Sequence, residues 1–190
     1  MNTTSIMIVG VGGQGTLLAS KLLGHVLLDA GYDVKLSEVH GMSQRGGSVV
    51  TYVRYGERVY SPIVDRGEAD VILSFEILES ARWISYLKQN GKLITNTQKT
   101  WPMPVITGAM PYPEDIAEKL SQMADVTAVD ALALATQAGS PKAVNVVLIG
   151  VLSKQMDIPE AAWLAAIEAT VPPRFLELNK KAFALGRGIQ

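Results

Sequence analysis

The stretch SIMIVGVGGQGTLLASKLLGHVLLDAG, residues 5–31, decides the fold. Its first part, SIMIVG, is a nearly continuous apolar run, which is typical of a strand buried on both faces of a parallel sheet. Its second part has apolar residues at helical spacing and ends at Gly31, a residue type that commonly closes a helix. Between the two parts lie Gly10, Gly12, Gly13 and Gly15, so the stretch predicts a strand, a tight glycine turn and a helix.

The rest of the chain continues to alternate short β-rich runs with longer helical patterns. This order is expected of a mostly parallel sheet that is covered by helices. Further strands are predicted in the stretches YDVKLSEV, DVILSF, KLITNT and VTAVDA. Helices are predicted over residues 76–89, 114–124 and 142–155, after Pro159, and after Pro172.

The stretch SVVTYVRYGERVYSPIV departs from this alternation. Its two runs of alternating β-branched and aromatic residues meet at residues 55–58, which predicts a β-hairpin. With 48% hydrophobic residues, a chain of 190 residues can bury one substantial core. We therefore expect residues 1–190 to form a single domain of the α/β class: a Rossmann-like three-layer fold with a mostly parallel sheet, a β-hairpin insertion and a helical C-terminal region.

The composition argues against several classes of function. A formal net charge of -1 gives no general attraction to nucleic acid or to an anionic membrane. The longest apolar run, AVNVVLIGVL, reaches only about half of a membrane span, and the N-terminus lacks the basic region of a signal peptide. The absence of cysteine excludes disulfides and thiolate-ligated iron–sulfur clusters in this chain. We expect a cytoplasmic protein with no nucleic-acid partner, no membrane partner and no metal site.

The glycine turn is a candidate binding site for an anion. Glycines let a ligand approach the backbone closely, and the N–H groups at the start of the following helix favour phosphate. Glu38 ends the second predicted strand, where an NAD-binding domain carries its ribose-binding acid, but a polar loop follows it in place of the usual helix. Alternatively, the glycines only allow close packing of the helix on the strand. The candidate residues of the turn are Gly10, Gly12, Gly13, Gln14 and Gly15.

The stretch EVHGMSQRGGSV, residues 38–49, is the second candidate site. Its glycines let backbone amides turn into a concavity, and Arg45 offers a planar set of donors suited to carboxylate or phosphate. His40 or Arg45 alone would be an ordinary surface residue, but together they follow the carboxyl end of a strand, where open α/β sheets bind ligands. We predict a loop at an active site or interface, with the candidate residues Glu38, His40, Ser43, Gln44, Arg45, Gly46 and Gly47.

Three further polar residues are interpreted as structural. Glu76 and Glu79 stand at the start of a predicted helix; they are either functional acids or, as is more usual in a first turn, partners of the helix dipole. Asn145 lies in an apolar helix and is interpreted as a hydrogen-bonded core or interface group.

The stretches IMIVGVGGQGTLLASKLLG, EVHGMSQRGGSV, ADVILSFEILESAR and NVVLIGVL together carry a family resemblance. They resemble the gamma-type domain of 2-oxoacid:ferredoxin oxidoreductases, and within that family the small (beta) subunit type of indolepyruvate ferredoxin oxidoreductase. The resemblance covers nearly the whole chain, and HGMSQRGG is its most specific piece. It implies that the glycine turn need not bind a dinucleotide, and that Glu38 belongs to an interface or to a hydrogen bond within the loop.

This resemblance implies a division of labour between two chains. The family oxidatively decarboxylates a 2-oxoacid, such as an aryl pyruvate, to an acyl-CoA, with coenzyme A as co-substrate, and it reduces ferredoxin. That chemistry needs thiamine diphosphate with Mg²⁺ and iron–sulfur clusters, but this chain has no cysteine and no GDG motif followed by an asparagine. The resemblance therefore implies a larger partner subunit that holds these cofactors, and a small subunit that binds none of them and is inactive alone.

Assembly is expected from the apolar character of the chain. Apolar helices near the C-terminal end predict surface that another chain covers, so we expect a homo-oligomer in isolation and a hetero-oligomer with the larger subunit. Two alternatives stay open. One is a free-standing Rossmann-like nucleotide-binding or regulatory module that uses the glycine turn and Glu38 for an adenosine ligand. The other is a structural partner subunit that contacts no ligand.

Overall fold

A six-stranded sheet forms the centre of the computed structural model, which describes residues 3–39 and 45–189. The sheet has the order β2-β3-β1-β4-β5-β6. Three pairs of neighbouring strands are parallel (β1 with β4, β4 with β5, β5 with β6), whereas β3 runs antiparallel to both β1 and β2. The sheet is therefore mostly parallel, as predicted. The strands are β1 (Thr4–Val11), β2 (Asp33–Glu38), β3 (Ser48–Gly56), β4 (Ala69–Ser74), β5 (Leu87–Asn96) and β6 (Asp125–Val129).

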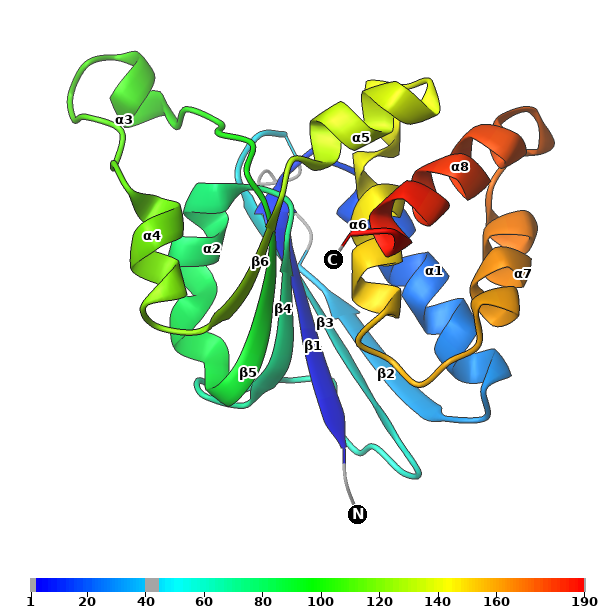
Figure 1. Cartoon of the computed structure of the whole chain (residues 1–190). Helices are drawn as coiled ribbons and strands as arrows, with labels where there is room; N and C mark the ends of the chain where they lie inside the picture. The colour runs from blue at the N-terminus through cyan, green and yellow to red at the C-terminus, as the bar shows by residue number, and fades with distance from the viewer. Residues whose placement is uncertain (1–2, 40–44, 190) are drawn as a thin grey trace.

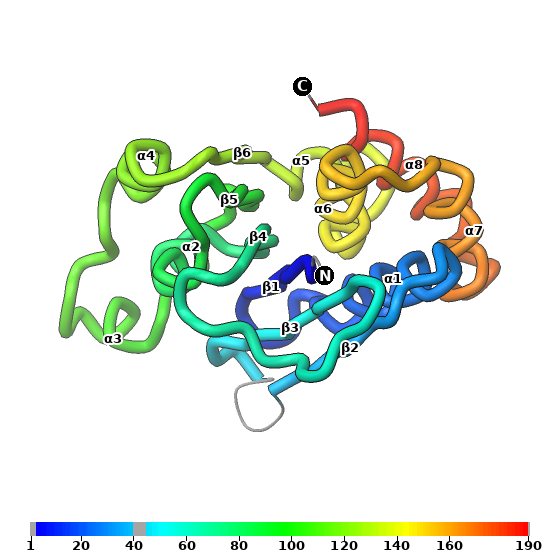
Figure 2. Tube along the Cα trace, turned by 90° about the horizontal axis from the view of Figure 1, so that it is seen from below, coloured from blue at the N-terminus to red at the C-terminus, as the bar shows by residue number. Residues whose placement is uncertain are grey.

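Helices cover both faces of this sheet (Figure 1). The tube in Figure 2 shows the same three layers from below, with one group of helices on each side of the strands. One layer contains α1 (Thr16–Asp29), α5 (Ala131–Ala138), α6 (Val144–Ser153), α7 (Glu160–Thr170) and α8 (Leu176–Arg187). The other contains α2 (Ile77–Trp83) and α4 (Ile116–Ser121), and the single-turn α3 (Met103–Ile106) stands further out.

The two hydrophobic cores explain the continuous apolar run of β1. Ile6 and Ile8 belong to the core with α1 and α6, whereas Met7 and Val9 belong to the core with α2 and α4. All four side chains are buried. A strand that is covered on both faces needs apolar residues at consecutive positions, which is the pattern that the sequence shows.

All ten residues of helix α6 are buried. A helix that is covered on every side needs apolar residues all around it, and the sequence of α6 is accordingly almost entirely apolar. It packs so closely on α8 that glycine is required at the contact: a Cβ at Gly186 would lie 2.0 Å from the carbonyl oxygen of Val147. A Cβ at Gly150 would likewise lie 2.3 Å from the carbonyl oxygen of Phe183. This packing places the run AVNVVLIGVL in the core. Among the described residues, no helix combines the length and the apolar character needed to cross a membrane.

The predicted β-hairpin is wrong in its position. Residues 57–68 contain no strand, and the antiparallel partners of β3 are β1 and β2. The segment after β3 is held by Arg54, which donates to the carbonyl oxygen of Ile63 over 2.8 Å, and by Asp33, which accepts from the backbone N–H of Val59 over 2.8 Å. Val59 and Val64 are buried, so the alternating pattern of this segment reflects burial without strand pairing.

Two helix predictions also need correction. The helix predicted over 76–89 ends at Trp83, a 3-10 turn follows at Ile84–Tyr86, and β5 already begins at Leu87. Asn90 adopts φ 65 inside β5, where the pairing register with β4 shifts; the Asn-Gly pair therefore bends a strand and does not end a helix. Helix α5 was not predicted, although Asp130 caps it by accepting from the backbone N–H of Ala133 over 2.9 Å.

Candidate functional site

The glycine turn joins β1 to α1 at the carboxyl edge of the sheet (Figure 1). Gly13 and Gly15 adopt the left-handed φ values 98 and 85, which favour glycine. At Gly15 a Cβ would also lie 2.7 Å from Nδ2 of Asn145. Glycine is therefore needed at both positions for the backbone alone, whether or not the turn binds a ligand.

Gln14 fixes the turn to the neighbouring strand. Its Oε1 accepts from the backbone N–H of Val11 over 2.8 Å, and its Nε2 donates to the carbonyl oxygen of Phe75 over 3.3 Å. Asn145 fixes the other end, because its Nδ2 donates to the carbonyl oxygen of Gly15 over 3.3 Å. Asn145 is buried and hydrogen-bonded, as the sequence interpretation expects.

The second candidate stretch meets the glycine turn directly. The backbone N–H of Gly12 donates to the carbonyl oxygen of Gly47 over 2.8 Å. Arg45 and Gly46 are exposed beside this contact, and Gly46 adopts a left-handed φ of 89. His40, Ser43 and Gln44 lie outside the described residues.

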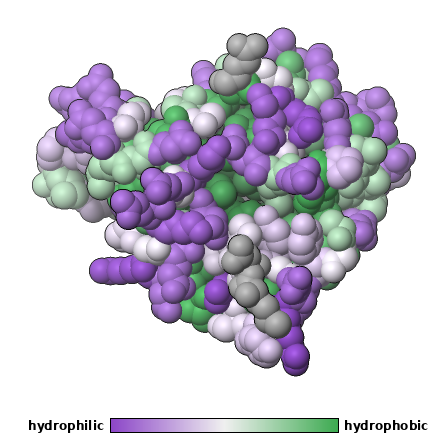
Figure 3. All heavy atoms as spheres, turned by 60° about the horizontal axis from the view of Figure 1, so that its bottom comes forward, coloured by the Kyte–Doolittle hydropathy of each residue, from purple (hydrophilic) through white to green (hydrophobic). Residues whose placement is uncertain are grey.

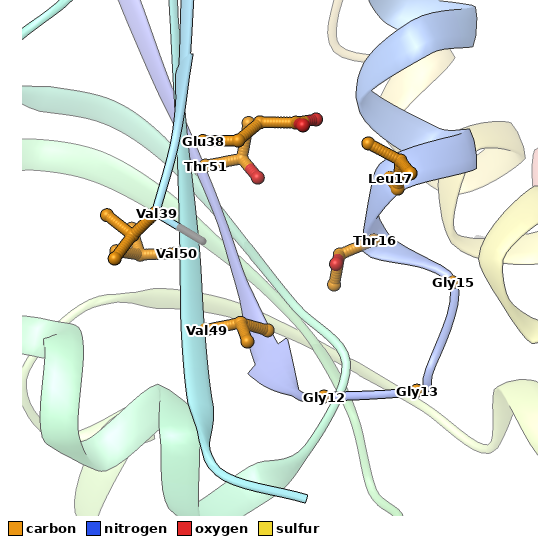
Figure 4. Close-up of a pocket in the computed structure, with 10 residues that line it drawn as sticks. All are labelled: Gly12, Gly13, Gly15, Thr16, Leu17, Glu38, Val39, Val49, Val50 and Thr51. Atoms are coloured by element: carbon orange, nitrogen blue, oxygen red, sulfur yellow. The ribbon is translucent and has the colours of Figure 1, made fainter. Parts of the chain in front are cut away.

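Glu38 and the glycine turn line one cavity of about 290 Å³ (Figure 4). The Glu38 side chain points from β2 across this cavity toward α1. There its Oε1 accepts from the Oγ of Ser20, a buried residue of α1, over 2.7 Å. Glu38 thus holds β2 against α1. The cavity is lined by Gly12, Gly13, Gly15, Thr16, Leu17, Glu38, Val39, Val49, Val50 and Thr51.

A larger cavity of about 580 Å³ lies on the other side of the glycine turn. Gly13, Gln14 and Gly15 form one wall, and Gln98 and Lys142 are among its other lining residues. Sequence reasoning missed Lys142. Nothing in the local sequence indicates that Lys142 lies at this cavity; in the structure Ser140 accepts from the backbone N–H of Lys142 over 3.3 Å at the start of a short turn before α6. Lys142 adds the positive charge that the turn itself lacks.

Glu76 is a buried junction between three segments. It caps α2 by accepting from the backbone N–H of Glu79 over 2.9 Å. Its other oxygen, Oε1, accepts from the backbone N–H of Thr100 over 2.9 Å and from the hydroxyl of Tyr112 over 3.1 Å. Burial, followed by the neighbouring charge of Glu76, raises the pKa of Tyr112 above its ordinary value. The interpretation of Glu76 as a partner of the helix dipole therefore describes only part of its role.

Glu79, also buried, ties the start of β3 to α2. Its carboxylate accepts from the hydroxyl of Ser48 and from the guanidinium of Arg82, and the indole N–H of Trp83 lies 3.3 Å away. Glu76 and Glu79 thus lie next to the loop at residues 45–48, with which they line one pocket. Their partners come from distant parts of the chain, so no local pattern indicates them. Within the described part of the chain, no group of three or more histidine, aspartate and glutamate side chains is placed to hold a metal ion.

A family model described as pyruvate ferredoxin/flavodoxin oxidoreductase matches residues 5–189. The chain belongs to this family. A relative within the pyruvate ferredoxin/flavodoxin oxidoreductase family, the indolepyruvate oxidoreductase subunit IorB of Thermococcus kodakarensis, is 46% identical over 192 residues, which cover 98% of this chain and 95% of the relative.

Solved structures share the fold. Subunit PORC of the pyruvate oxidoreductase of Thermotoga maritima aligns with a TM-score of 0.76 at 23% identity, over 98% of this chain and 96% of that chain. A 2-oxoglutarate:ferredoxin oxidoreductase of Magnetococcus marinus aligns with a TM-score of 0.77 at 18% identity, over 100% of this chain but only 31% of that chain. The family resemblance and the fold class predicted from the sequence are confirmed: this chain is a subunit of the 2-oxoacid:ferredoxin oxidoreductase type.

Proposed function

We propose that this chain is the small subunit of an indolepyruvate-type 2-oxoacid:ferredoxin oxidoreductase and is inactive without its larger partner. The complex oxidatively decarboxylates an aryl pyruvate or a related 2-oxoacid, transfers the acyl group to coenzyme A, and passes the released electrons to ferredoxin. The observation that carries the proposal is the 46% identity to the Thermococcus IorB subunit over nearly the full length of both chains.

The larger subunit supplies the cofactors in this proposal. Thiamine diphosphate with Mg²⁺ provides the electron sink for decarboxylation, and iron–sulfur clusters carry single electrons to ferredoxin. The small chain contains no cysteine with which to ligate a cluster. The support for a larger partner is that the Magnetococcus chain, about three times as long as its matching part, includes this fold as 31% of one polypeptide.

The small subunit's own contribution lies at the carboxyl edge of the sheet. Arg45 stands exposed beside the hydrogen bond between Gly12 and Gly47, and it meets an anionic group in the partner's active site or on the substrate. Lys142 and the turn around Gly13 line the cavity of about 580 Å³, which holds the anionic part of coenzyme A. Glu38 acts structurally, through its hydrogen bond to Ser20.

The test is reconstitution with the larger subunit, which is identified by its thiamine diphosphate and iron–sulfur content. We expect the isolated small chain to be colourless and inactive, and the complex to form acyl-CoA from an aryl pyruvate while it reduces ferredoxin. A complex that contains both chains and their cofactors but converts no 2-oxoacid would refute the proposal. Titration of the isolated chain with NAD and ATP tests the nucleotide-module alternative; tight binding of either would support that alternative.

A further inference from the structure

The segment that follows β5 exposes an unusual amount of apolar surface. Residues 100–112, here called the apolar arm, contain α3 and lead toward α4. Figures 1 and 2 both show α3 standing away from the sheet. In Figure 3, pale green residues gather at the left margin, on the side where α3 and α4 lie in Figure 1. Four large side chains of the arm are more than half exposed: Trp101 (59%), Met103 (66%), Ile106 (61%) and Met110 (54%).

The arm is nevertheless held in a defined conformation. Both of its ends bind one buried oxygen, because Oε1 of Glu76 accepts from the backbone N–H of Thr100 and from the hydroxyl of Tyr112. Within the arm, the backbone N–H of Ile106 donates to the carbonyl oxygen of Pro102 over 3.1 Å, and that of Met110 to the carbonyl oxygen of Pro104 over 3.2 Å. Pro102 and Pro104 also restrict the backbone. An apolar surface that is already ordered loses little conformational entropy when another chain binds it.

The arm lies beside the loop that precedes β3, although the two segments are far apart in the chain. One pocket of about 160 Å³ is lined by Gly46 and Gly47 of the loop together with Trp101 and Met103 of the arm. Glu79, which also lines this pocket, anchors the loop through Ser48, just as Glu76 anchors the arm. The arm and the loop therefore form one continuous surface whose two parts are fixed by neighbouring carboxylates of the same helix start.

We propose that the apolar arm docks onto the larger subunit of the oxidoreductase, with Met103 and Ile106 inserted into an apolar depression of that subunit. This inference rests on the proposed function, since the loop that adjoins the arm is the part that meets the partner's active site. Exposed apolar patches of this kind mark protein-binding surfaces, and large apolar side chains at their centre dominate the binding energy. The Magnetococcus chain, in which this fold adjoins a much longer remainder, supports the same occupant.

The test measures binding of small-subunit variants to the cofactor-loaded larger subunit. Met103→Glu and Ile106→Glu each place a charge in the proposed apolar contact. We expect both to raise the dissociation constant roughly ten- to a hundredfold, as substitutions at an interface centre do. Met123→Glu is the matched control, because Met123 is 68% exposed but lies beyond α4, outside the arm. Its dissociation constant should equal that of the wild type. Thermal melting of the three isolated variants checks that each one folds.

The outcomes separate this inference from the proposed function. Wild-type affinity in both folded arm variants would overturn the inference, even if the complex is an active oxidoreductase. An effect of the arm variants on self-association alone would assign the arm to a second copy of this chain, and it would also overturn the inference. Loss of binding in the arm variants but not in Met123→Glu supports the inference. If the wild-type complex then converts no 2-oxoacid, the proposed function fails while the docking surface stands.

Discussion

The backbone N–H of Gly12 and the carbonyl oxygen of Gly47 form a hydrogen bond of 2.8 Å across the carboxyl edge of the sheet. The bond joins the glycine turn after β1 to the loop before β3, although α1 and β2 separate them in the chain. Two motifs that the sequence presents separately are therefore one structural unit. A substitution that distorts the turn should disturb the loop as well.

The glycine turn permits a test of backbone strain against steric clash. Gly13→Ala forces alanine into a left-handed conformation, which costs about 1–2 kcal/mol, but its Cβ meets nothing within 4 Å. Gly15→Ala carries the same strain and also places its Cβ 2.7 Å from Nδ2 of Asn145. Urea unfolding should therefore show a larger loss of stability for Gly15→Ala. Equal losses in the two variants would mean that Asn145 moves away without cost.

The buried carboxylate of Glu79 should matter more for stability than a first-turn acid usually does. Glu79→Gln keeps the shape but replaces one acceptor oxygen by an NH2 group, at a place where the Ser48 hydroxyl, the Arg82 guanidinium and the Trp83 indole N–H already donate. Leaving the buried amide at position 79 without acceptors costs roughly 1–3 kcal/mol, which urea unfolding can measure. The matched control is Glu118→Gln, since Glu118 occupies the first turn of α4 but is exposed. A loss no larger than in this control would reduce Glu79 to a partner of the helix dipole.

Patterns along the chain predict most of the elements of this fold, because burial on one or two faces imposes a period on local sequence. The run SIMIVG predicts β1 for this reason, and Gly31 marks the end of α1 within two residues. Strand order is different. The insertion of β3 between β1 and β2 depends on pairing between distant segments, so the alternating pattern of residues 48–64 predicts a hairpin that does not form.

The residues of the candidate site likewise fall into two groups, those that the sequence indicates and those that only the fold brings together. Glycines and the exposed Arg45 are visible in the sequence because they interrupt an apolar pattern. The junction at Glu76 is not visible, because its partners Thr100 and Tyr112 lie beyond β5 and α3. Lys142 escapes notice for a related reason: it stands beside the glycine turn only because α5 and α6 fold back over the sheet edge.

Tyr112 gives the folded protein a defined response to alkaline pH. Burial and then the charge of Glu76 raise its pKa above the ordinary tyrosine value of about 10. The unfolded chain thus loses this proton at lower pH than the folded protein does. The stability that the group contributes is fully present below about pH 10 and falls as the pH rises above that value. Tyr112→Phe should therefore lose less stability than the wild type over this range in urea unfolding.

Two other tyrosines also contribute to the loss of stability at alkaline pH, so Tyr112→Phe removes only part of that loss. Burial also raises the pKa values of Tyr52 and Tyr55, so the variant should keep part of the alkaline loss. The informative quantity is the difference between the slopes of the two proteins. Identical slopes would contradict the environment described for Tyr112. A reduced tyrosinate absorbance change at high pH in the variant would give a second, spectroscopic measure of the same group.

Arg45 provides the most direct test of the loop in catalysis. Its side chain is exposed in the isolated subunit, so Arg45→Ala should leave folding intact. If Arg45 donates to an anion in the complex, its loss removes a charged hydrogen bond of on the order of 1.5–3 kcal/mol. The kcat/KM of the reconstituted complex should then fall roughly ten- to a hundredfold for the 2-oxoacid or for coenzyme A.

The choice of replacement and control makes this test specific. Arg45→Lys should restore only part of the activity, because an ammonium group cannot reproduce the paired donors of a guanidinium. Arg58→Ala is the matched control: Arg58 is also exposed, but it follows the opposite end of β3. Varying the 2-oxoacid and coenzyme A separately shows which anion Arg45 meets, since only the kcat/KM of that substrate falls. If Arg45→Ala assembles normally and leaves both values unchanged, Arg45 makes no catalytic contact and the assignment of the loop to the active site is wrong.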